Sequence, residues 1–369
     1  MAQRMTIHYN QKPYYDIVFS QGFDELPAEL EALEIENRRV CIFTDSIVKP
    51  LYANTIEEIL KDRCKKAVIF CFPAGEQNKT LDTVKEAYTF LIKEEFDRKD
   101  LLIALGGGVV GDMTGYTAAT YLRGIDFIQI PTTLLAQADS SIGGKTGVDF
   151  DGYKNMVGAF HMPRLVYMNV SVLKTLDERQ YFSGFAEIMK HGLIRDQLFY
   201  EWLLEHMYEI CDREPSILEE MVIKSSSIKK MIVEKDPTEK GERALLNFGH
   251  TIGHAIEKAR NFELLHGECV ALGCVAAAYI SWKHQLLTMD EYYEIRDMFV
   301  PFNLPISVEG INPEEILTLT RSDKKMSGGQ IKFILLKKVG KAVIDTTVTG
   351  EDILNAVKEI HFTEEDMTA

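Results

Sequence analysis

The sequence LLIALGGGVVGDMTG at residues 101–115 decides the fold, because a short apolar run passes directly into closely spaced glycines. The apolar run has the length and composition of a buried strand. Gly106, Gly108 and Gly111 follow the spacing G-x-G-x-x-G, and a helix is expected to begin near Asp112. Glycines let peptide N–H groups approach a pyrophosphate, and the helix adds its dipole. Since such turns are also common as punctuation, the spacing alone does not assign a cofactor.

Strand and helix signals alternate on both sides of this stretch. Short apolar runs predict further strands at 38–45, 67–72 and 125–130. Helical patterns lie between them, at 49–63 and 81–95. This alternation predicts a parallel sheet covered on both faces, which is a Rossmann-like α/β arrangement.

The periodicity of the apolar residues changes after about residue 176. Helical periods dominate from there on, at 184–211, 216–234, 245–259, 267–286, 290–300 and 313–321. Two extended segments, at 331–338 and 343–348, interrupt them. We therefore predict an α/β N-terminal domain over residues 1–178 and a mostly α-helical C-terminal domain over residues 179–369.

Composition limits the class of protein. Apolar residues make up 46% and charged residues 26% of 369 residues, which is ordinary globular usage. Six scattered cysteines without a C-x-x-C pair argue against disulfides and thiolate zinc sites, and favour a reducing cytoplasm. Residues 1–10 are mixed and polar, so we expect no signal peptide. The longest apolar run, 270–282, is too short for a membrane span.

The net charge of −15 restricts the partners. Nucleic acid is disfavoured, because its binding draws on clustered positive charge. An anionic small substrate would be repelled at long range. If the substrate is an anion, lysines and arginines must therefore gather at its site.

Histidines gather in one part of the helical region. His250 and His254 in NFGHTIGH are spaced i, i+4, and His266 follows in HGE. Neutral imidazole suits Zn²⁺, and a catalytic zinc site needs three protein ligands and an open position. The best carboxylate to complete the set is Glu187 in GFAEIMKHG, one turn before Lys190. Spacing alone does not choose among the three histidines.

A polar stretch follows the strand at 125–130. Residues 131–147, PTTLLAQADSSIGGKTG, place an acid, serines and Lys145 where a buried strand would have apolar residues. Gly143 and Gly144 just before the lysine suggest a backbone that closes on an anion. Basic residues that could answer the charge requirement recur near the other motifs, at Lys154, Lys190, Lys229, Arg243, Lys324 and Lys325.

Six motifs, in order along nearly the whole chain, resemble the 3-dehydroquinate synthase family of sugar-phosphate cyclases. They are GGGVVGDMTGYTAATYLRG at 106–124, IPTTLLAQADSSIGGKTGVD at 130–149, KNMVGAF at 154–160, GFAEIMKHG at 184–192, LLNFGHTIGHAIE at 245–257 and HGE at 266–268. The glycerol and iron-dependent alcohol dehydrogenases share the fold more distantly. The resemblance implies a dehydroquinate synthase-like fold.

The resemblance also implies a metal site and a cofactor site. Glu187, His250 and His266 would bind zinc, with cobalt as an alternative, and His254 would instead lie beside a substrate phosphate. The residues implied to contact NAD are Asp45, Glu76, Lys79, Gly107, Gly108, Val109, Asp112, Thr132, Thr133, Lys145, Lys154, Thr175 and Leu176.

A sugar-phosphate substrate is implied as well. Its catalytic contacts would be Asp139, Lys145, Lys190, Arg243 and His254. Its further binding contacts would be Lys154, Asn155, Lys229, Asn247 and Lys324 or Lys325, with Arg123 reaching toward a partner subunit of a homodimer. Two residues depart from the family pattern: Asn169 stands where aspartate is common and Cys274 where methionine is usual, and we expect packing consequences only.

The implied reaction converts 3-deoxy-D-arabino-heptulosonate 7-phosphate to 3-dehydroquinate and phosphate, in the shikimate pathway of aromatic amino acid biosynthesis. NAD oxidises a ring alcohol transiently, phosphate is eliminated, the ketone is reduced again, and ring opening precedes an aldol closure. The alternatives are another sugar-phosphate cyclase, such as 2-deoxy-scyllo-inosose synthase acting on glucose 6-phosphate, and a metal-dependent alcohol dehydrogenase.

Overall fold

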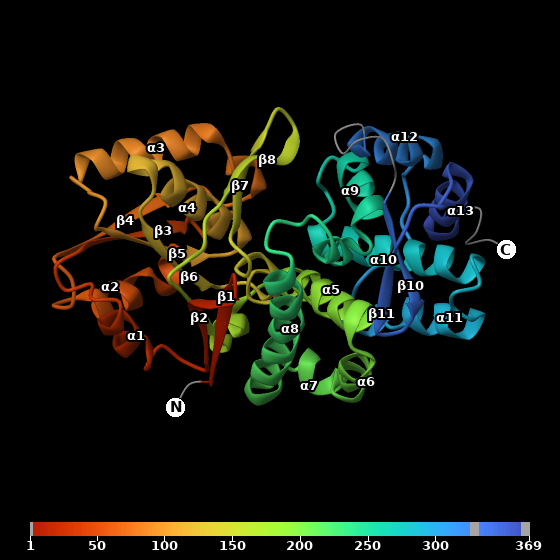
Figure 1. The fold of residues 1–369 in the computed structure, drawn as a ribbon, viewed down its shortest axis with the longest axis horizontal. Helices are drawn as coiled ribbons and strands as arrows, with labels where there is room; N and C mark the ends of the chain where they lie inside the picture. The colour runs from red at the N-terminus through yellow and green to blue at the C-terminus, as the bar shows by residue number, and fades with distance from the viewer. Residues whose placement is uncertain (1–2, 325–331, 363–369) are drawn as a thin grey trace. The chain divides into compact units, whose positions relative to one another are not determined.

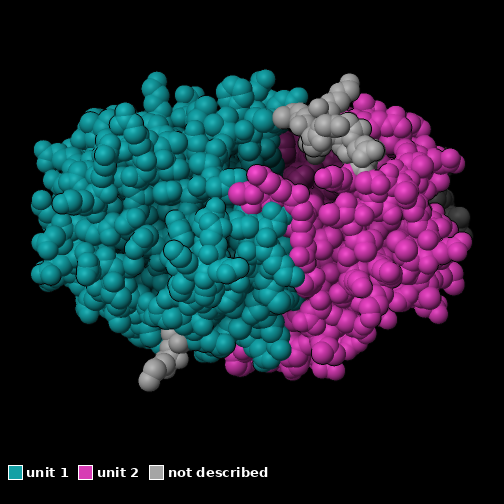
Figure 2. Space-filling view, in the orientation of Figure 1, with its two compact units in different colours: residues 1–176, 218–237 teal, residues 177–217, 238–369 magenta. Residues whose placement is uncertain are grey.

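The computed structural model describes residues 3–324 and 332–362, and it divides the chain into two compact units. Unit 1 comprises Met1–Leu176 and Leu218–Pro237, and unit 2 comprises Asp177–Ile217 and Thr238–Ala369 (Figures 1 and 2). The long helix α8 (Pro215–Lys235) thus lies mostly in unit 1, although it follows three helices of unit 2 in the sequence. Within the described residues no helix is both long and apolar enough to span a membrane.

Unit 1 is built on a seven-stranded sheet in the order β1-β2-β9-β6-β5-β3-β4. All neighbouring strands are parallel except the pair β1 and β2. The strands are β1 (Gln3–Tyr9), β2 (Lys12–Ser20), β3 (Arg39–Asp45), β4 (Lys66–Phe72), β5 (Leu101–Gly106), β6 (Asp126–Pro131) and β9 (Leu165–Asn169). The predicted parallel α/β sheet is confirmed, with an antiparallel hairpin added at one edge.

Helices cover both faces of this sheet because its strands are apolar on both sides. In β5, Leu101, Ile103 and Leu105 face the cluster that includes α1 (Leu26–Ala32) and α2 (Asn54–Leu60). Leu102 and Ala104 face the opposite cluster, with α3 (Leu81–Lys93) and α4 (Gly108–Thr120). The remaining helical segments of unit 1 are the short turns η1 (Lys49–Ala53), η2 (Glu76–Asn78), η3 (Tyr121–Arg123), η4 (Ala136–Ser140) and η5 (Val170–Thr175).

A second hairpin occupies part of the stretch that the sequence marked only as a polar loop. Strands β7 (Lys145–Phe150) and β8 (Tyr153–Phe160) pair antiparallel and stand outside the main sheet (Figure 1). Gly147 and Gly158 face each other in this ladder, and a Cβ at Gly147 would lie 2.8 Å from the carbonyl oxygen of Val157. The two strands therefore approach closely only because these positions lack side chains.

Unit 2 is mostly helical, as predicted. Its helices are α5 (Glu178–Arg195), α6 (Gln197–Glu205), α7 (Met207–Cys211), α9 (His250–Ala259), α10 (His266–Lys283), α11 (Met289–Asp297), α12 (Pro313–Lys324) and α13 (Gly350–Ile360), with the turns η6 (Glu242–Asn247) and η7 (Val300–Phe302). Strands β10 (Phe333–Lys338) and β11 (Lys341–Asp345) form a small antiparallel pair. The apolar helix α10 is buried on nearly all sides, and α5, α9, α11 and α13 pack around it.

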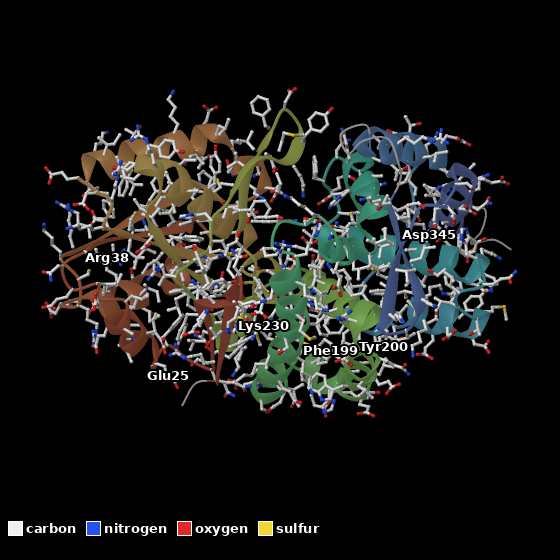
Figure 3. All side chains as sticks on the ribbon, in the orientation of Figure 1. Glu25, Arg38, Phe199, Tyr200, Lys230 and Asp345 are labelled. Atoms are coloured by element: carbon white, nitrogen blue, oxygen red, sulfur yellow. The ribbon has the colours of Figure 1, made fainter. Side chains whose placement is uncertain are left out.

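The helix expected over residues 184–211 is in fact three helices. Asp196 adopts an extended conformation between α5 and α6, and its side chain accepts a hydrogen bond from the amide of Phe199. This N-cap starts a new helix, on which Phe199 and Tyr200 are buried (Figure 3). The first helix also begins earlier than expected, because Asp177 caps it through the amide of Gln180.

Candidate functional site

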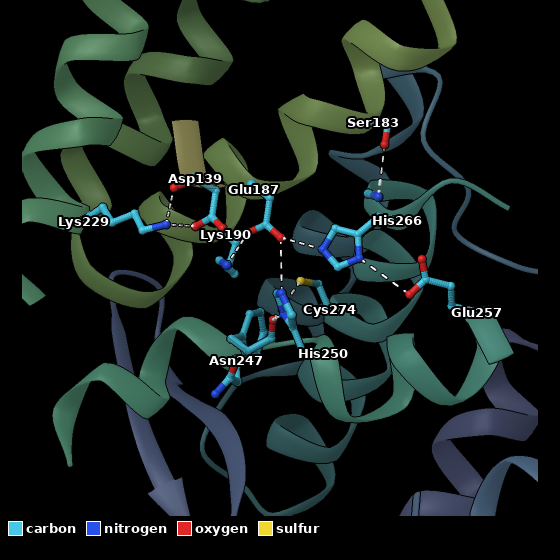
Figure 4. Close-up of polar contacts among 12 residues, drawn as sticks. Asp139, Ser183, Glu187, Lys190, Lys229, Asn247, His250, Glu257, His266 and Cys274 are labelled. Atoms are coloured by element: carbon cyan, nitrogen blue, oxygen red, sulfur yellow. Dashed lines mark hydrogen bonds and ion pairs between the residues drawn. The ribbon is translucent and has the colours of Figure 1, made fainter. Parts of the chain in front are cut away.

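Unit 2 brings a carboxylate and two imidazoles together (Figure 4). Glu187 lies in α5 and is fully buried, while His250 and His266 are the first residues of α9 and α10. The Nε2 atoms of His250 and His266 lie 3.2 and 3.3 Å from the same oxygen, Oε1 of Glu187. Three helices thus deliver one potential ligand atom each to a single point.

The other nitrogen of each imidazole faces away from that point. His250 Nδ1 lies 3.0 Å from the carbonyl oxygen of Phe248, which can only accept a hydrogen bond. His266 Nδ1 lies 3.7 Å from Oε2 of Glu257. When a cation takes the place of the Nε2 protons beside Glu187, the oxygens that face both Nδ1 atoms keep the remaining ring proton at Nδ1, which is the tautomer that binds metals.

The charged groups of this cluster shift one another's pKa values. Burial alone raises the pKa of Glu187, but Lys190, whose Nζ contacts Oε2, and His250 outweigh it and hold that pKa well below its usual range. Burial lowers the pKa of His266, yet its hydrogen bonds with Glu187 and Glu257 raise it to about 9. Without a cation among them, the ligands therefore hold an ionised carboxylate that attracts positive charge.

Two glycines allow the helices to approach this closely. A Cβ at Gly267 would overlap the backbone carbonyl of Ser183, one turn before Glu187 on α5. The amide of Gly267 also donates a hydrogen bond to Ser183 Oγ, at 3.0 Å. Gly249 has a φ of 80°, and a Cβ there would lie 2.9 Å from the carbonyl oxygen of Val270. With glycine next to each histidine, the first turn of α10 can therefore meet α5 and the first turn of α9 can meet α10.

The two carboxylate–imidazole separations have the length that a tetrahedral metal requires. Bond lengths of about 2.0–2.2 Å to nitrogen and oxygen place neighbouring ligand atoms roughly 3.3–3.5 Å apart. The separations of 3.2 and 3.3 Å match this edge. A set of two histidines and one carboxylate also leaves a fourth position open, as catalytic zinc sites do.

In unit 1 the residues expected at a dinucleotide lie at one edge of the sheet. Asp45 ends β3, Gly107 and Gly108 follow β5, and Thr132 and Thr133 follow β6. Carboxyl ends of parallel strands share an edge, which is where α/β sheets bind ligands. Helix α4 begins at this edge with glycines, so its first amides are accessible to an anion.

Two observations fit a bound dinucleotide at this edge. A Cβ at Gly107 would lie 3.0 Å from Thr133 and one at Gly108 would lie 3.1 Å from Ser140, so side chains here would fill the space. The buried hydroxyl of Thr132 has no hydrogen-bond partner among the described residues. Such a group is available to a hydrogen-bond partner from a bound ligand.

A buried lysine connects the segment after β4 with α4 and the β7–β8 hairpin. Lys79 is 3% exposed, and its Nζ donates hydrogen bonds to Asp112 Oδ2 at 2.7 Å and to Asn155 Oδ1 at 2.6 Å. Glu76 lies 3.8 Å from Lys79 and 3.7 Å from Lys154. Burial lowers the pKa of Lys79, but the adjacent carboxylates outweigh it and raise that pKa above its usual range. Five of the expected contact residues thus form one ionic cluster.

Replacement of Lys79 by methionine should destabilise unit 1 by about 2–3 kcal/mol, less than the loss for a fully buried pair, because it leaves the Asp112 carboxylate, whose side chain is 18% exposed, without its cation. The exposed pair Lys66–Glu94 provides the control, since its 2.6 Å separation is similar but the lysine side chain is 51% exposed. The Lys66→Met change should cost less than about 0.5 kcal/mol. Urea unfolding of both variants measures the difference, and equal losses would contradict the role of burial.

A second buried lysine meets an acid from the polar stretch. Lys229 in α8 is 4% exposed, and its Nζ donates hydrogen bonds to the side chain of Asp139, at 2.6 Å, and to the backbone carbonyl of the same residue (Figure 4). Both residues belong to unit 1. The two predicted substrate contacts therefore hold each other in this structure.

The other predicted site residues have varied surroundings. Arg243 is 3% exposed in η6, and Asn247 in the same turn donates a hydrogen bond to Glu239 at 2.8 Å. Lys145 begins β7 with an exposed side chain, Thr175 lies at the end of η5, where its hydroxyl bonds that of Tyr52, and Leu176 follows it. Val109 lies in the first turn of α4.

Four further predicted site residues are Arg123, His254, Lys324 and Lys325. Arg123 is exposed, and it follows Leu122 at a second consecutive positive φ. His254 lies one turn after His250, with its ring 5.8 Å from that of His266. Lys324 ends α12, and nothing is described of its side chain, while Lys325 lies outside the described residues.

Two acids that lie beside the predicted ligands were not predicted from the sequence. Glu257 lies on the same face of α9 as His250 and His254, at i, i+4 and i+7, and this spacing was available in the sequence. Glu268 caps α10 by accepting the amide of Leu265, and it also accepts hydrogen bonds from Arg179 at 2.6 and 2.8 Å. No local signal joins Arg179 to Glu268, because the two helices meet only in the fold.

The two departures from the motif pattern lie in packed positions. Asn169 caps η5 by accepting the amide of Ser171 at 2.9 Å, a role that aspartate can also fill. Cys274 is buried in α10, where its sulfur faces Gly249. A longer side chain at residue 274 would have to be accommodated against that glycine.

Comparisons with known proteins agree with this geometry. The family model for the 3-dehydroquinate synthase N-terminal domain matches residues 69–183, and the model for the C-terminal domain matches residues 184–326. A 3-dehydroquinate synthase of Acetivibrio thermocellus is 43% identical over 343 residues, which is 93% of this chain and 95% of that protein.

Solved structures of related cyclases share the architecture. The 2-epi-5-epi-valiolone synthase ValA of Streptomyces hygroscopicus, solved with NAD⁺ and Zn²⁺ bound, aligns with a TM-score of 0.88 and 27% identity over 96% of this chain and 99% of its own. A 2-deoxy-scyllo-inosose synthase complexed with carbaglucose-6-phosphate, NAD⁺ and Co²⁺ aligns with a TM-score of 0.86 and 26% identity over 97% of this chain and 100% of its own. With both family models matching in order, and with a relative of this similarity over nearly its full length, the chain belongs to the 3-dehydroquinate synthase family.

Proposed function

We propose that this chain is a 3-dehydroquinate synthase, a phosphate-eliminating carbon–oxygen lyase that converts 3-deoxy-D-arabino-heptulosonate 7-phosphate to 3-dehydroquinate and phosphate. One observation carries the proposal: in a member of this family, two imidazole Nε2 atoms converge on one oxygen of the buried carboxylate Glu187. The reaction places the enzyme in the shikimate pathway of aromatic amino acid biosynthesis.

Glu187, His250 and His266 are proposed to hold a divalent metal, zinc or cobalt. Their spacing supports this assignment, as does the bound Zn²⁺ or Co²⁺ of the related cyclases. The chemistry supplied by the bound ion is Lewis-acid polarisation of the reacting hydroxyl. The buried Lys190 is proposed to act on that hydroxyl or its neighbour, since its ammonium group contacts the carboxylate of Glu187.

NAD is the proposed cofactor of unit 1, used catalytically and not consumed. We propose that Asp45, at the end of β3, binds a ribose, and that the amides of Gly107, Gly108 and Val109, at the start of α4, bind the pyrophosphate. Thr132 offers the hydroxyl that lacks a partner. The chemistry supplied by bound NAD is acceptance and return of a hydride. The further proposed contacts are Glu76, Lys79, Asp112, Thr133, Lys145, Lys154, Thr175 and Leu176.

The substrate is proposed to be held by cations and amides that overcome the net charge of −15. Lys145, Lys154, Asn155 and His254 would bind the phosphate. Arg243 and Lys229 would bind the carboxylate, for which the arginine fork is suited. Asp139, which pairs with Lys229, would orient that lysine, and Asn247 and Lys324 or Lys325 complete the proposed set. Holding one conformer in this way lowers the entropic part of the barrier.

Three broader assignments belong to the same proposal. We assign NAD binding to residues 1–178 and metal and substrate binding mainly to residues 179–369. We propose a cytoplasmic homodimer, in which the exposed Arg123 reaches the partner subunit. Sedimentation of the parent protein and of an Arg123→Ala variant tests the dimer separately from the activity.

A phosphate-release assay tests the function. With NAD and Zn²⁺, the chain should release phosphate from the heptulosonate 7-phosphate, and a chelator should lower the rate by at least about 100-fold until Zn²⁺ or Co²⁺ is restored. The control is the same protein with glucose 6-phosphate as the substrate. No phosphate release from the heptulosonate under these conditions would disprove the proposal.

The same assay separates the alternatives. A 2-deoxy-scyllo-inosose synthase would turn over glucose 6-phosphate faster than the heptulosonate, since its substrate has no carboxylate for Arg243 and Lys229. A metal-dependent alcohol dehydrogenase would accumulate NADH, which absorbance of the reduced nicotinamide measures. The proposed synthase returns each hydride within the turnover, so no NADH should accumulate.

A further inference from the structure

A buried acid lies behind one of the proposed ligands. Glu257 is 3% exposed, and it occupies the face of α9 that also carries His250 and His254. Its Oε2 lies 3.7 Å from Nδ1 of His266, on the side of the ring away from Glu187 (Figure 4). A carboxylate is costly to bury, so its position beside an imidazole N–H requires an explanation.

We propose that Glu257 is a positioning residue for the metal: it fixes the tautomer and the orientation of His266. The proposal rests on the metal site assigned under the proposed function. His266 has two ring nitrogens and only one proton when it is neutral. With the Glu257 carboxylate 3.7 Å from Nδ1, the proton of a neutral ring stays at Nδ1, which leaves the lone pair of Nε2 for a cation held between the ring and Glu187 Oε1.

The two histidines differ in the group that faces Nδ1. For His250 this group is the backbone carbonyl of Phe248, which remains when the side chain of Phe248 is substituted. For His266 the acceptor is a charged side chain. A carboxylate behind a ligating imidazole also raises its basicity, which strengthens the bond to a cation. Glu257 is therefore the outer contact of these two histidines that a substitution can test.

A competing arrangement uses the same atoms. Potential ligand atoms of His254, Glu257 and His266 also lie within 4.8 Å of one another. In that arrangement Glu257 would be a ligand of a second ion, on the opposite nitrogen of His266. The two arrangements predict different stoichiometries, one metal ion per chain for the proposal and two for the alternative.

Substitution of Glu257 by glutamine, in the full-length protein, tests the proposal. Competition with a chromophoric chelator should show Zn²⁺ and Co²⁺ affinity reduced about 10- to 100-fold, at one ion per chain in the parent. The visible absorption of bound Co²⁺ should change in intensity or position, because the imidazole is no longer held. Neither measurement depends on catalysis.

Glu268→Gln is the matched control. Glu268 is also a buried acid, two residues from His266, but it pairs with Arg179 and caps the backbone. Metal affinity should fall clearly less in this variant than in Glu257→Gln, even where its thermal stability falls as much. Equal losses of affinity in the two variants would overturn the proposal, because they would assign the effect to general stability.

The remaining outcomes separate this proposal from the metal site itself. A parent protein that binds no metal disproves both the site and the role of Glu257. A parent that binds one ion, lost in Glu187→Gln but held within twofold by Glu257→Gln, disproves only the positioning role. Two ions in the parent, falling to one in Glu257→Gln, would identify Glu257 as a ligand and overturn the proposal.

Discussion

Glutamine at residue 187 is expected to abolish metal binding and to lower the rate of phosphate release by about 10³-fold or more, which corresponds to about 4 kcal/mol of lost transition-state stabilisation. Glutamine keeps the volume of Glu187 but replaces the anionic oxygen on which His250 and His266 converge. Two neutral imidazoles remain, and two ligands hold a divalent ion much less tightly than three. Metal analysis after dialysis and the phosphate assay measure the two effects.

The fold of this variant needs its own control, because Lys190 is 1% exposed and loses the carboxylate beside it. Removal of one partner of a buried pair costs about 3–5 kcal/mol. The double variant Glu187→Gln/Lys190→Met removes both charges and should recover most of that stability without recovering the metal. Full metal content in either variant, with the double variant folded, would refute the assignment of Glu187.

Alanine at residue 267 is the second change with a large expected effect. A Cβ there would overlap the carbonyl of Ser183, and both groups belong to helix backbones that cannot rotate away. Overpacking of this kind costs about 3 kcal/mol, which lowers Tm by roughly 6 °C. The helices carrying Glu187 and His266 must also separate, and a shift of about 1 Å at a catalytic site can cost about 100-fold in rate.

Gly22→Ala is the matched control for this substitution. A Cβ at Gly22 would lie 3.2 Å from Asp24 Oδ2, the end of a flexible side chain that can move. Its Tm should stay within about 2 °C of the parent, since surface substitutions of this kind cost little. Thermal unfolding and the phosphate assay on both variants give the comparison, and a Gly267→Ala variant with parental activity would contradict the proposed helix contact.

The sheet of unit 1 was predictable because its signals are local. Strands such as β3 and β5 are apolar on both faces, and segments with helical periodicity separate them. This pattern is typical of a parallel sheet. Strands β7 and β8 were missed because the hairpin stands outside the main sheet and several of its side chains are exposed, as for Phe150 and Tyr153. Their close pairing depends on the facing Gly147 and Gly158, and only a short apolar contact, Val148 opposite Val157, joins the hairpin to the core.

The edge hairpin β1–β2 was missed for a related reason. An edge strand needs few apolar residues, and β1 is largely exposed, with Arg4 paired to Asp16 across the ladder. The division of the helix expected over 184–211 depends on Asp196, which is a good N-cap but also an ordinary surface residue in a helix. Only the packed structure distinguishes the two.

In the candidate site, too, the local motifs could be predicted from the sequence and the contacts between distant segments could not. The spacing of His250 and His254 on one helix face was visible in the sequence, and so was the acid in GFAEIMKHG. Which nitrogen meets Glu187 depends on how α5, α9 and α10 pack, and this contact joins segments 63 and 79 residues apart along the chain. The link between Lys79 and Asn155 is likewise non-local, because the fold alone brings them to one buried point.

Helix α8 limits where the polypeptide can be cleaved and when unit 1 can fold during synthesis, because it belongs to unit 1 but follows part of unit 2 in the sequence. The chain leaves unit 2 near the start of α8 and returns to unit 2 after its end. The helix packs on unit 1 through contacts such as His8–Glu234 and Lys229–Asp139. A fragment ending near residue 176 would lack this helix, so no single cleavage yields an intact unit 1. During synthesis, unit 1 can reach its final form only after the ribosome has translated about 60 residues beyond Leu176. The first part of these residues, Asp177–Ile217, belongs to unit 2, and the rest supplies helix α8.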